Sequence, residues 1–216
     1  MKIGIIGAGA IGQIYAKLWR AAGHQVMLSA RDAGKLAAIV KQLGPGVQAG
    51  TPTEAAAFGD VVLLAVNYAT IEDAITAVEP RVTGKLVIDA TNPLRWKDDG
   101  SDTERVIGDD EIAGLVMAAK LPNARVAKAF TTLWTGHVER HADVADPTVA
   151  MTLAADAADD RETVAGLVRD AGLVPVSLGT LAQSGPLDPP SPIWNVVLTP
   201  DDLKARVTAI RLAGNA

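Results

Sequence analysis

Directly after Met1 the chain reads Lys2-Ile3-Gly4-Ile5-Ile6-Gly7-Ala8-Gly9-Ala10-Ile11-Gly12, an apolar run that passes at once into a glycine-rich turn. Residues 13–22 then have the apolar spacing of a helix, and residues 25–29 form a second apolar run. The glycines match G-x-G-x-x-G. The first permits a tight turn, the second lets the backbone approach a pyrophosphate, and the third permits close packing of helix and strand. This order predicts a dinucleotide-binding unit, with the phosphates at the helix N-terminus.

The end of the second predicted strand indicates which dinucleotide binds. An NAD site places Asp or Glu there to accept from the ribose hydroxyls, but this chain has Ser29 and Ala30. Arg31 follows, and Lys35 lies one helical turn further on. A guanidinium forms paired, charge-assisted bonds with a phosphate, and the Ser29 hydroxyl can add another. We therefore expect NADP(H) as the cofactor.

Two observations leave alternatives open at this position. Asp32 lies at about the distance from Gly12 that an NAD-binding acid would have, but it also precedes a helical pattern over residues 32–43. We interpret Asp32 as the N-cap of that helix. The alternative for Arg31 is an ordinary solvated surface charge.

Composition excludes several classes of protein. The chain has 216 residues, 49% hydrophobic and 21% charged, which is typical of a globular protein with a sizeable core. The net charge of −5 argues against nucleic acid as a partner. The lack of cysteine excludes disulfides and thiolate catalysis, and the sequence contains no apolar run of membrane-spanning length. We expect no leader segment. We expect a cytoplasmic protein that binds no membrane.

Apolar strands and helices continue to alternate after Arg31, which predicts a parallel sheet covered on both faces. We expect an α/β fold of the Rossmann type, a doubly wound parallel sheet. The predicted strands cover residues 47–49, 60–66, 85–89 and 125–129. The predicted helices cover residues 51–58 with Thr53 as the cap, 70–78 and 105–119, and residues 95–104 are expected to form a polar loop.

The pattern changes near residue 133. Strands are predicted over residues 148–153 and 174–177, and helices over 159–171 and 200–212. A Pro- and Gly-rich loop is predicted over residues 179–192. We therefore expect an NADP-binding Rossmann domain over residues 1–133 and a small α/β C-terminal domain over 134–216, on the acceptor side or at a dimer interface.

Ligands of open parallel sheets bind beyond the carboxyl ends of the strands. Short polar side chains that could fix a nicotinamide ribose or carboxamide stand there, while Asn92-Pro93 could equally form only a turn. The candidates after the fourth, fifth and sixth strands are Val66 and Asn67, then Thr91, Asn92 and Pro93, then Thr131.

The same loops hold no acid–base pair that stands out, so the catalytic residues stay unassigned. The spacing of four between His137 and His141 would put both on one helix face, but His-Val-Glu-Arg-His matches no zinc motif, and we expect no metal. Trp96 and Trp134 could stack on a flat ligand or close off the site. The alternative is a solvated loop with one buried Trp.

Four motifs together resemble the family of deazaflavin-dependent NADP reductases, which transfer hydride between NADP(H) and coenzyme F420. They are Gly7–Gly12, Ser29–Asp32, Asp89–Leu94 and Val126–Thr132, and residues 171–181 resemble the C-terminal signature of the family. The resemblance implies a Rossmann domain followed by a small C-terminal domain, often in a homodimer.

The resemblance also implies site residues. It assigns Gly7, Gly9, Ala10 and Ile11 to the pyrophosphate, and Ala30, Arg31 and Lys35 to the region of the 2′-phosphate. The sequence differs from the family pattern at Ala30, Thr131 and Asp188, where the family commonly has Ser, Asn and Glu.

These observations predict an NADP(H)-dependent oxidoreductase that transfers hydride between the nicotinamide and a planar acceptor, either F420 or a flavin-like molecule. A non-catalytic NADP(H)-binding sensor or partner protein is one alternative, because such a protein would also have a cofactor site without an acid–base pair. A small carbonyl or imine reductase is the other.

Overall fold

The structure is a computed structural model that describes residues 1–142 and 147–214. The chain divides into two compact units. The first unit comprises residues 1–91 and 117–126, and the second comprises residues 92–116 and 127–216, apart from those outside the described ranges. The expected division was linear, with one border after residue 133. The units instead interleave, because residues 92–116 belong with the second unit before the chain returns to the first.

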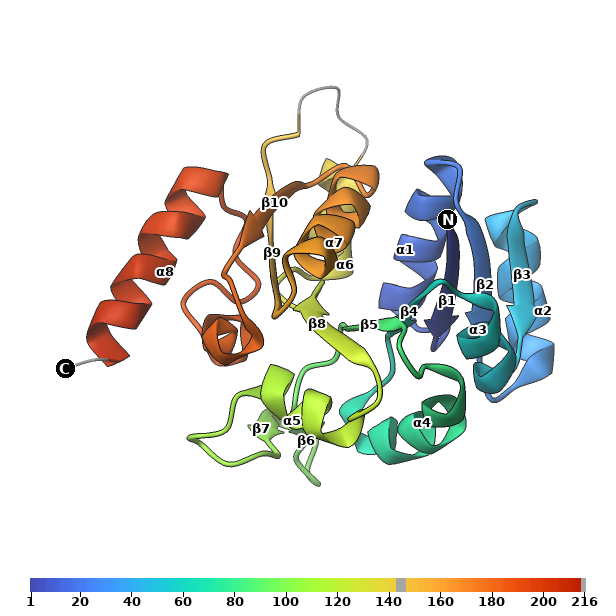
Figure 1. Ribbon diagram of the computed structural model, residues 1–216, viewed down its shortest axis with the longest axis horizontal. Coiled ribbons are helices and arrows are strands. Elements are labelled where there is room, and N and C mark those ends of the chain that lie inside the picture. The colour runs from blue at the N-terminus through green and yellow to red at the C-terminus, as the bar shows by residue number, and fades with distance from the viewer. Residues whose placement is uncertain (143–146, 215–216) are drawn as a thin grey trace. The chain divides into compact units, whose positions relative to one another are not determined.

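The first unit contains a parallel sheet with the strand order β5-β4-β1-β2-β3 (Figure 1). Its strands are β1 (Lys2–Ile6), β2 (Gln25–Ser29), β3 (Val47–Gly50), β4 (Val61–Leu64) and β5 (Leu86–Asp89). Every residue of β4 and β5 is buried, as is typical of parallel strands covered on both faces. The predicted Rossmann-type sheet is confirmed.

Helices form a layer on each face of this sheet. Helix α1 (Ala10–Ala21) packs against α2 (Ala33–Leu43), and α3 (Pro52–Phe58) packs against α4 (Ile71–Val78). The short 3-10 turns η1 (Tyr68–Thr70) and η2 (Glu79–Arg81) flank α4. Helix α1 begins three residues earlier than expected, directly after Gly9.

The helix caps correct one expectation and confirm another. The Asp32 carboxylate accepts from the Lys35 backbone N–H at 3.0 Å, so Asp32 is the predicted N-cap of α2. The cap of α3 is Thr51 rather than the predicted Thr53, because β3 ends at Gly50 and Pro52 occupies the first helical position. The Thr53 hydroxyl instead donates to the Ala77 carbonyl at 3.0 Å, which ties α3 to α4.

The second unit contains the strand order β10-β9-β8, formed by β8 (Arg125–Ala129), β9 (Ala150–Ala155) and β10 (Val174–Ser177). Strand β9 runs antiparallel to β8 and parallel to β10. The helices are α6 (Thr135–His141), α7 (Ala158–Asp170) and the terminal α8 (Pro200–Gly214). Leu203 and Val207 of α8 join the buried cluster that contains Leu178 and Leu187. The predicted loop over 179–192 contains two short 3-10 turns, η3 (Leu181–Gln183) and η4 (Gly185–Leu187).

Residues 94–112 differ from the prediction of a loop followed by a helix from Arg105. Antiparallel strands β6 (Leu94–Trp96) and β7 (Thr103–Arg105) form a hairpin, and helix α5 (Ala113–Lys120) begins eight positions later than Arg105. The Arg105 guanidinium donates to the carbonyls of Glu111, at 2.5 Å, and Pro189, at 3.2 Å. These bonds hold residues 105–112 in an irregular path that a helix would not allow.

Across the described part of the chain, each helix is too short or too polar to cross a lipid bilayer.

Candidate functional site

A pocket of about 470 Å³ lies at the carboxyl end of the parallel strands of the first unit. The strand register explains why residues distant in sequence meet there, because Ile6 pairs with both Ser29 and Leu64. Each of these strands therefore delivers the residues that follow it to the same edge. Seven predicted site residues line the pocket: Gly7, Gly9, Ser29, Ala30, Arg31, Val66 and Asn67.

The glycines of the turn are required for two different reasons. Gly7 has φ +111°, and a Cβ atom there would lie 2.3 Å from the Ala65 carbonyl oxygen. A Cβ atom on Gly12 would lie 2.0 Å from the Gly7 carbonyl oxygen. A Cβ atom on Gly9 would have no protein atom within 4 Å. The Gly9 backbone thus faces open space, as the approach of a pyrophosphate requires.

The N-terminus of α1 carries the donors that an anion needs. Gly9 is the N-cap, no side chain caps the helix, and the first turn contains no acidic residue. Gln13 is the first residue whose N–H is bonded back to the start of the helix, at 3.0 Å to the Gly9 carbonyl. Among the described residues nothing accepts from the N–H groups of Ala10, Ile11 and Gly12. Free N–H groups and the positive end of the helix dipole suit phosphate oxygens.

Arg31 is the cation that the structure leaves free at the end of β2. It is exposed, and within residues 1–142 and 147–214 no side chain or backbone group forms a hydrogen bond or ion pair with its guanidinium. Lys35, in contrast, lies with its ammonium 3.9 Å from the Asp32 carboxylate. The α2 cap therefore occupies Asp32 and leaves Arg31 available for a ligand.

Ser29 has a different environment from the one expected. It is fully buried, and its hydroxyl donates to the Ile5 carbonyl at 2.9 Å. Its backbone carbonyl accepts from the Gly7 N–H at 3.1 Å. In this arrangement Ser29 holds the glycine turn against β2, and its hydroxyl hydrogen is not available to a phosphate.

One wall of the pocket was not predicted from the sequence. This wall comes from the start of α3 and from η1 and α4, and is formed by Pro52, Thr70, Asp73, Ala74 and Ala77. Two signals could have identified it. Pro52 follows β3 just as Arg31 follows β2, and Ala74 and Ala77 are small residues spaced three apart on one helix face.

Thr91 lies in the first unit but does not line the pocket. It is buried, and its hydroxyl donates to the Asp89 carboxylate at 2.6 Å.

Asn92, Pro93 and Thr131 belong to the second unit. The Asn92 amide donates to the Thr131 carbonyl at 3.2 Å, so two of the predicted site residues of the second unit are in contact. The Asn92 side-chain oxygen and the Thr131 hydroxyl are buried, and neither has a hydrogen-bond partner among the described residues. Phe130 precedes Thr131 with φ +63°, a strained value for a residue other than glycine. Strain beside unsatisfied polar groups is typical of a ligand site.

The predicted tryptophans are both exposed and both lie in the second unit, Trp96 at 63% and Trp134 at 60%. The Trp134 backbone N–H donates to the Asn195 side chain at 3.1 Å, and its ring meets the edge of His137 with centroids 5.8 Å apart. His137 and His141 both lie on α6. No group of three or more His, Cys, Asp or Glu residues in the described chain is placed to hold a metal ion.

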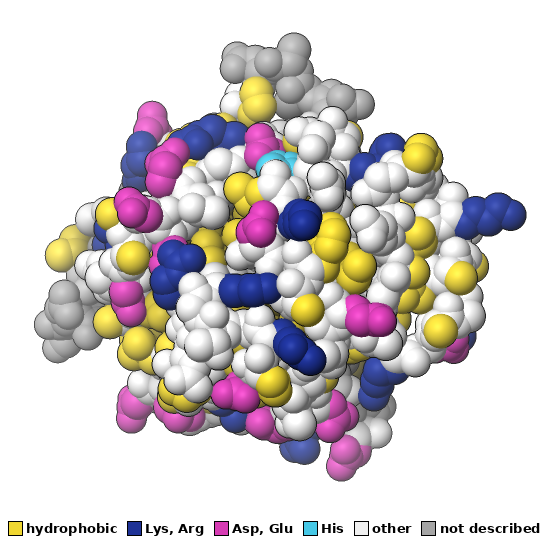
Figure 2. All heavy atoms as spheres, turned by 45° about the vertical axis from the view of Figure 1, so that its right-hand side comes forward, with side chains coloured by type: hydrophobic (Ala, Val, Ile, Leu, Met, Phe, Trp, Pro, Cys, Tyr) yellow, Lys and Arg dark blue, Asp and Glu magenta, His cyan; other side chains and the backbone are white. Residues whose placement is uncertain are grey.

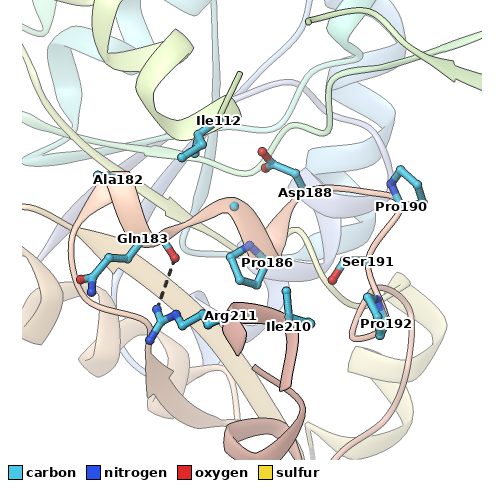
Figure 3. A pocket seen from close by; sticks show the side chains of 11 residues that line it. Ile112, Ala182, Gln183, Pro186, Asp188, Pro190, Ser191, Pro192, Ile210 and Arg211 are labelled. Carbon is cyan, nitrogen blue, oxygen red and sulfur yellow. Dashed lines mark hydrogen bonds between the residues drawn. The ribbon is translucent and has the colours of Figure 1, made fainter. Parts of the chain in front are cut away.

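A second pocket, of about 560 Å³, is formed within the second unit by residues of the 182–192 loop together with Ile112, Ile210 and Arg211 (Figure 3). The Arg211 guanidinium points toward the Gln183 carbonyl and donates to it at 3.4 Å. The Asp188 carboxylate accepts from the Ala113 N–H at 2.8 Å and lies 3.9 Å from the Arg105 guanidinium. Asp188 therefore caps α5 and holds the 94–112 segment to this loop.

Charges are mixed on the molecular face that Figure 2 presents. Several Lys and Arg side chains lie near its centre, Asp and Glu side chains are frequent along its lower edge, and hydrophobic side chains lie between them.

Comparison with known proteins agrees with this geometry. The family model described as NADP oxidoreductase, coenzyme F420-dependent, matches residues 2–93. A hypothetical protein of Sinorhizobium meliloti is 30% identical with a TM-score of 0.81, over 92% of this chain and 95% of that one. No curated protein matches the chain.

Two more distant structures share the fold. A provisionally assigned F420-dependent NADP reductase of Arthrobacter sp. FB24 is 22% identical with a TM-score of 0.75, over 84% of this chain and 86% of that one. An imine reductase of Streptomyces aurantiacus is 16% identical with a TM-score of 0.62, over 87% of this chain and 58% of that one. The family model and the Sinorhizobium relative together identify the chain as a member of the NADP oxidoreductase family described as coenzyme F420-dependent.

Proposed function

We propose that the chain binds NADP(H) in the pocket of the first unit and transfers hydride between the nicotinamide and a planar acceptor, a deazaflavin such as F420 or a flavin. The observation that carries this proposal is the free guanidinium of Arg31 at the end of β2, where an NAD-binding protein would have a carboxylate. Membership in a family of NADP oxidoreductases supports it.

The residues present fit the cofactor part by part. Gly9 and the free N–H groups of Ala10 and Ile11 would bind the pyrophosphate. Arg31 would bind the 2′-phosphate, with Lys35 adding positive charge from the next helical turn. In the second unit, taken by itself, the buried Asn92 side-chain oxygen and Thr131 hydroxyl have no hydrogen-bond partner among the described residues, so they are candidate ligand groups of that unit.

The proposed hydride transfer requires no general acid or base from the protein. Bound NADPH supplies one hydride, which carries both electrons, and the acceptor takes its balancing proton from water. The chain's own residues therefore bind and orient the two flat rings and keep competing groups away. This explains why an oxidoreductase of this kind needs no acid–base pair among its strand-end loops.

The experiment that tests the cofactor assignment is titration of Arg31→Ala with NADPH and with NADH. Loss of a charged hydrogen bond should weaken NADPH by roughly 1.5–3 kcal/mol, or about 10- to 150-fold in Kd. NADH should be nearly unaffected, because it lacks the 2′-phosphate. Lys41→Ala is the matched control, since it removes a positive charge from α2, the helix that follows Arg31, at a position that does not line the pocket. Equal losses for both nucleotides would contradict the assignment.

A second experiment tests the reaction. NADPH oxidation, followed by absorbance, should proceed with F420 or a flavin as acceptor. Turnover with carbonyl or imine substrates only would contradict the planar acceptor and identify the chain as a reductase of small molecules. Binding of NADPH without turnover on any of these acceptors would favour a sensor or partner protein.

A further inference from the structure

We propose that Asp73 recognises the amino group of the adenine ring and makes the first-unit pocket selective for adenine over bases that carry an oxygen at the same position. The inference rests on the proposed binding of NADP(H) in this pocket and adds a specificity-determining residue to it.

Asp73 is the only acidic side chain among the described residues that line this pocket. It lies in the first turn of α4 beside Glu72. The Glu72 carboxylate is bound by the Lys120 ammonium at 2.5 Å and does not line the pocket. Over residues 1–142 and 147–214 nothing forms a hydrogen bond or ion pair with the Asp73 carboxylate. It is therefore free to accept from a ligand.

The wall around Asp73 suits the faces of a flat ring. Pro52, Val66, Ala74 and Ala77 present small apolar surfaces to the pocket. The Thr53 hydroxyl, bonded to the Ala77 carbonyl at 3.0 Å, fixes the start of α3 against α4 and so sets the distance between these surfaces. A heteroaromatic base has apolar faces and a polar edge, which matches an apolar wall with one polar group.

The negative charge of the Asp73 carboxylate determines which edge of the base it can contact. A carboxylate beside a phosphate-binding pocket repels an anionic ligand unless the ligand offers it a donor. The ionised carboxylate only accepts hydrogen bonds, and the adenine amino group donates them. Hypoxanthine carries a carbonyl oxygen at that position, which would leave the carboxylate facing another acceptor. Arg31, at the end of β2, would meanwhile meet the phosphate, so the two charges serve different parts of one ligand.

The test compares NADPH with its deamino analogue, in which hypoxanthine replaces adenine. Asp73 is exposed, so the expected difference comes from the hydrogen bond and charge attraction that the adenine amino group gains and the hypoxanthine carbonyl oxygen does not. We expect the wild-type protein to bind NADPH about tenfold more tightly, as for a hydrogen bond to a charged group. In Asp73→Asn the preference should fall to within about threefold, because an amide can either accept or donate at that edge. The ratio of the two Kd values is the readout, because a general change in charge affects both nucleotides alike.

Glu72→Gln is the matched control, because it removes the same charge from the neighbouring position and should keep the wild-type preference. Asp73→Ala should lose the preference for NADPH over the deamino analogue as Asp73→Asn does. Agreement between the two variants shows that the loss does not depend on the amide group of Asn. A wild-type ratio near one, or an unchanged ratio in Asp73→Asn while NADPH still binds, would overturn the role of Asp73 alone. Failure of the wild-type protein to bind either nucleotide would overturn the proposed function as well.

Discussion

Gly9 and Gly12 belong to one motif, yet the structure requires them for opposite reasons. At Gly12 the protein's own backbone leaves no room, since a Cβ atom would lie 2.0 Å from the Gly7 carbonyl oxygen. At Gly9 the protein leaves space free, and the backbone conformation, with φ −75°, is open to any residue. The first requirement concerns folding and the second concerns the ligand.

The two glycines should therefore respond differently to alanine. Gly12→Ala forces backbone atoms apart and should lower the free energy of unfolding by about 1–3 kcal/mol or more. Gly9→Ala should leave it within about 0.5 kcal/mol of wild type, or raise it slightly, because only the unfolded chain loses freedom. NADPH binding should nevertheless weaken, because the methyl group occupies the approach of the pyrophosphate. Urea denaturation and nucleotide titration measure the two effects separately, and unchanged affinity in Gly9→Ala would contradict this role.

Residue types at the site were predictable where the signal was local. The glycine turn, Arg31 and the Asp32 cap follow from neighbours within a few positions. Ser29 was harder to interpret, because its hydroxyl bonds to Ile5 on another strand, and only the strand register reveals that contact. Asp73 carries no local signal that separates it from Glu72, and only the fold turns one of them to the pocket.

Among the elements, helix α3 depends most clearly on its ends. Seven residues are too few for a stable isolated helix. At the N-terminus Thr51 and Glu54 form a capping box, in which the Glu54 carboxylate accepts from the Thr51 N–H at 2.8 Å. At the C-terminus the Lys85 ammonium donates to the carbonyls of Ala56 and Gly59, both at 2.8 Å. Partial burial lowers the pKa of Lys85. These contacts hold Pro52 at the pocket wall.

Removal of the capping box should destabilise the protein in a pH-dependent way. Thr51→Ala should lower the free energy of unfolding by about 1 kcal/mol at neutral pH. Hydrogen bonds from the Thr51 backbone and hydroxyl lower the pKa of Glu54. The ionised carboxylate is therefore stabilising above its ordinary pKa, and this contribution is lost as the pH falls through the lowered value. Urea denaturation of wild type and Glu54→Gln should differ at neutral pH and converge in acid, and a constant difference would contradict this account.

Element boundaries were predictable where the hydrophobic periodicity and the residues that commonly end a strand or helix indicated the same position. Strands β1, β2 and β10 match their predicted ranges because each apolar run ends at Ser or directly before Gly. The hairpin β6–β7 was not predicted. Each of its strands has only three residues, and polar residues that pair across it, such as Arg95 and Glu104, are also typical of a polar loop. The start of α5 was placed too early because Arg105 is held by carbonyls distant in sequence.

For the whole molecule, the sequence predicted a Rossmann-type sheet followed by a smaller part but not how the chain divides. Residues 92–116 leave the first unit and residues 117–126 return to it. The positions at which the chain passes from one unit to the other depend on which segments pack together, and the residue types at these positions do not identify them. The pocket in which we propose that NADP(H) binds nevertheless has all its described lining residues between positions 6 and 77, within the first unit. Ligand binding should therefore stabilise that unit first.

NADPH should accordingly raise thermal stability by an amount that grows with the logarithm of its concentration divided by its Kd. At about 100 times its Kd, a ligand that binds only the folded protein adds about 2.7 kcal/mol, and each kcal/mol raises Tm by roughly 2–4 °C in a chain of this size. NADH at the same concentration should give a smaller shift in Tm, because NADH lacks the 2′-phosphate that Arg31 would bind. Hydrogen exchange should show the added protection within residues 1–91, around β1, β2 and α4. Equal shifts with both nucleotides would contradict phosphate recognition by Arg31, and protection confined to the second unit would place the cofactor elsewhere.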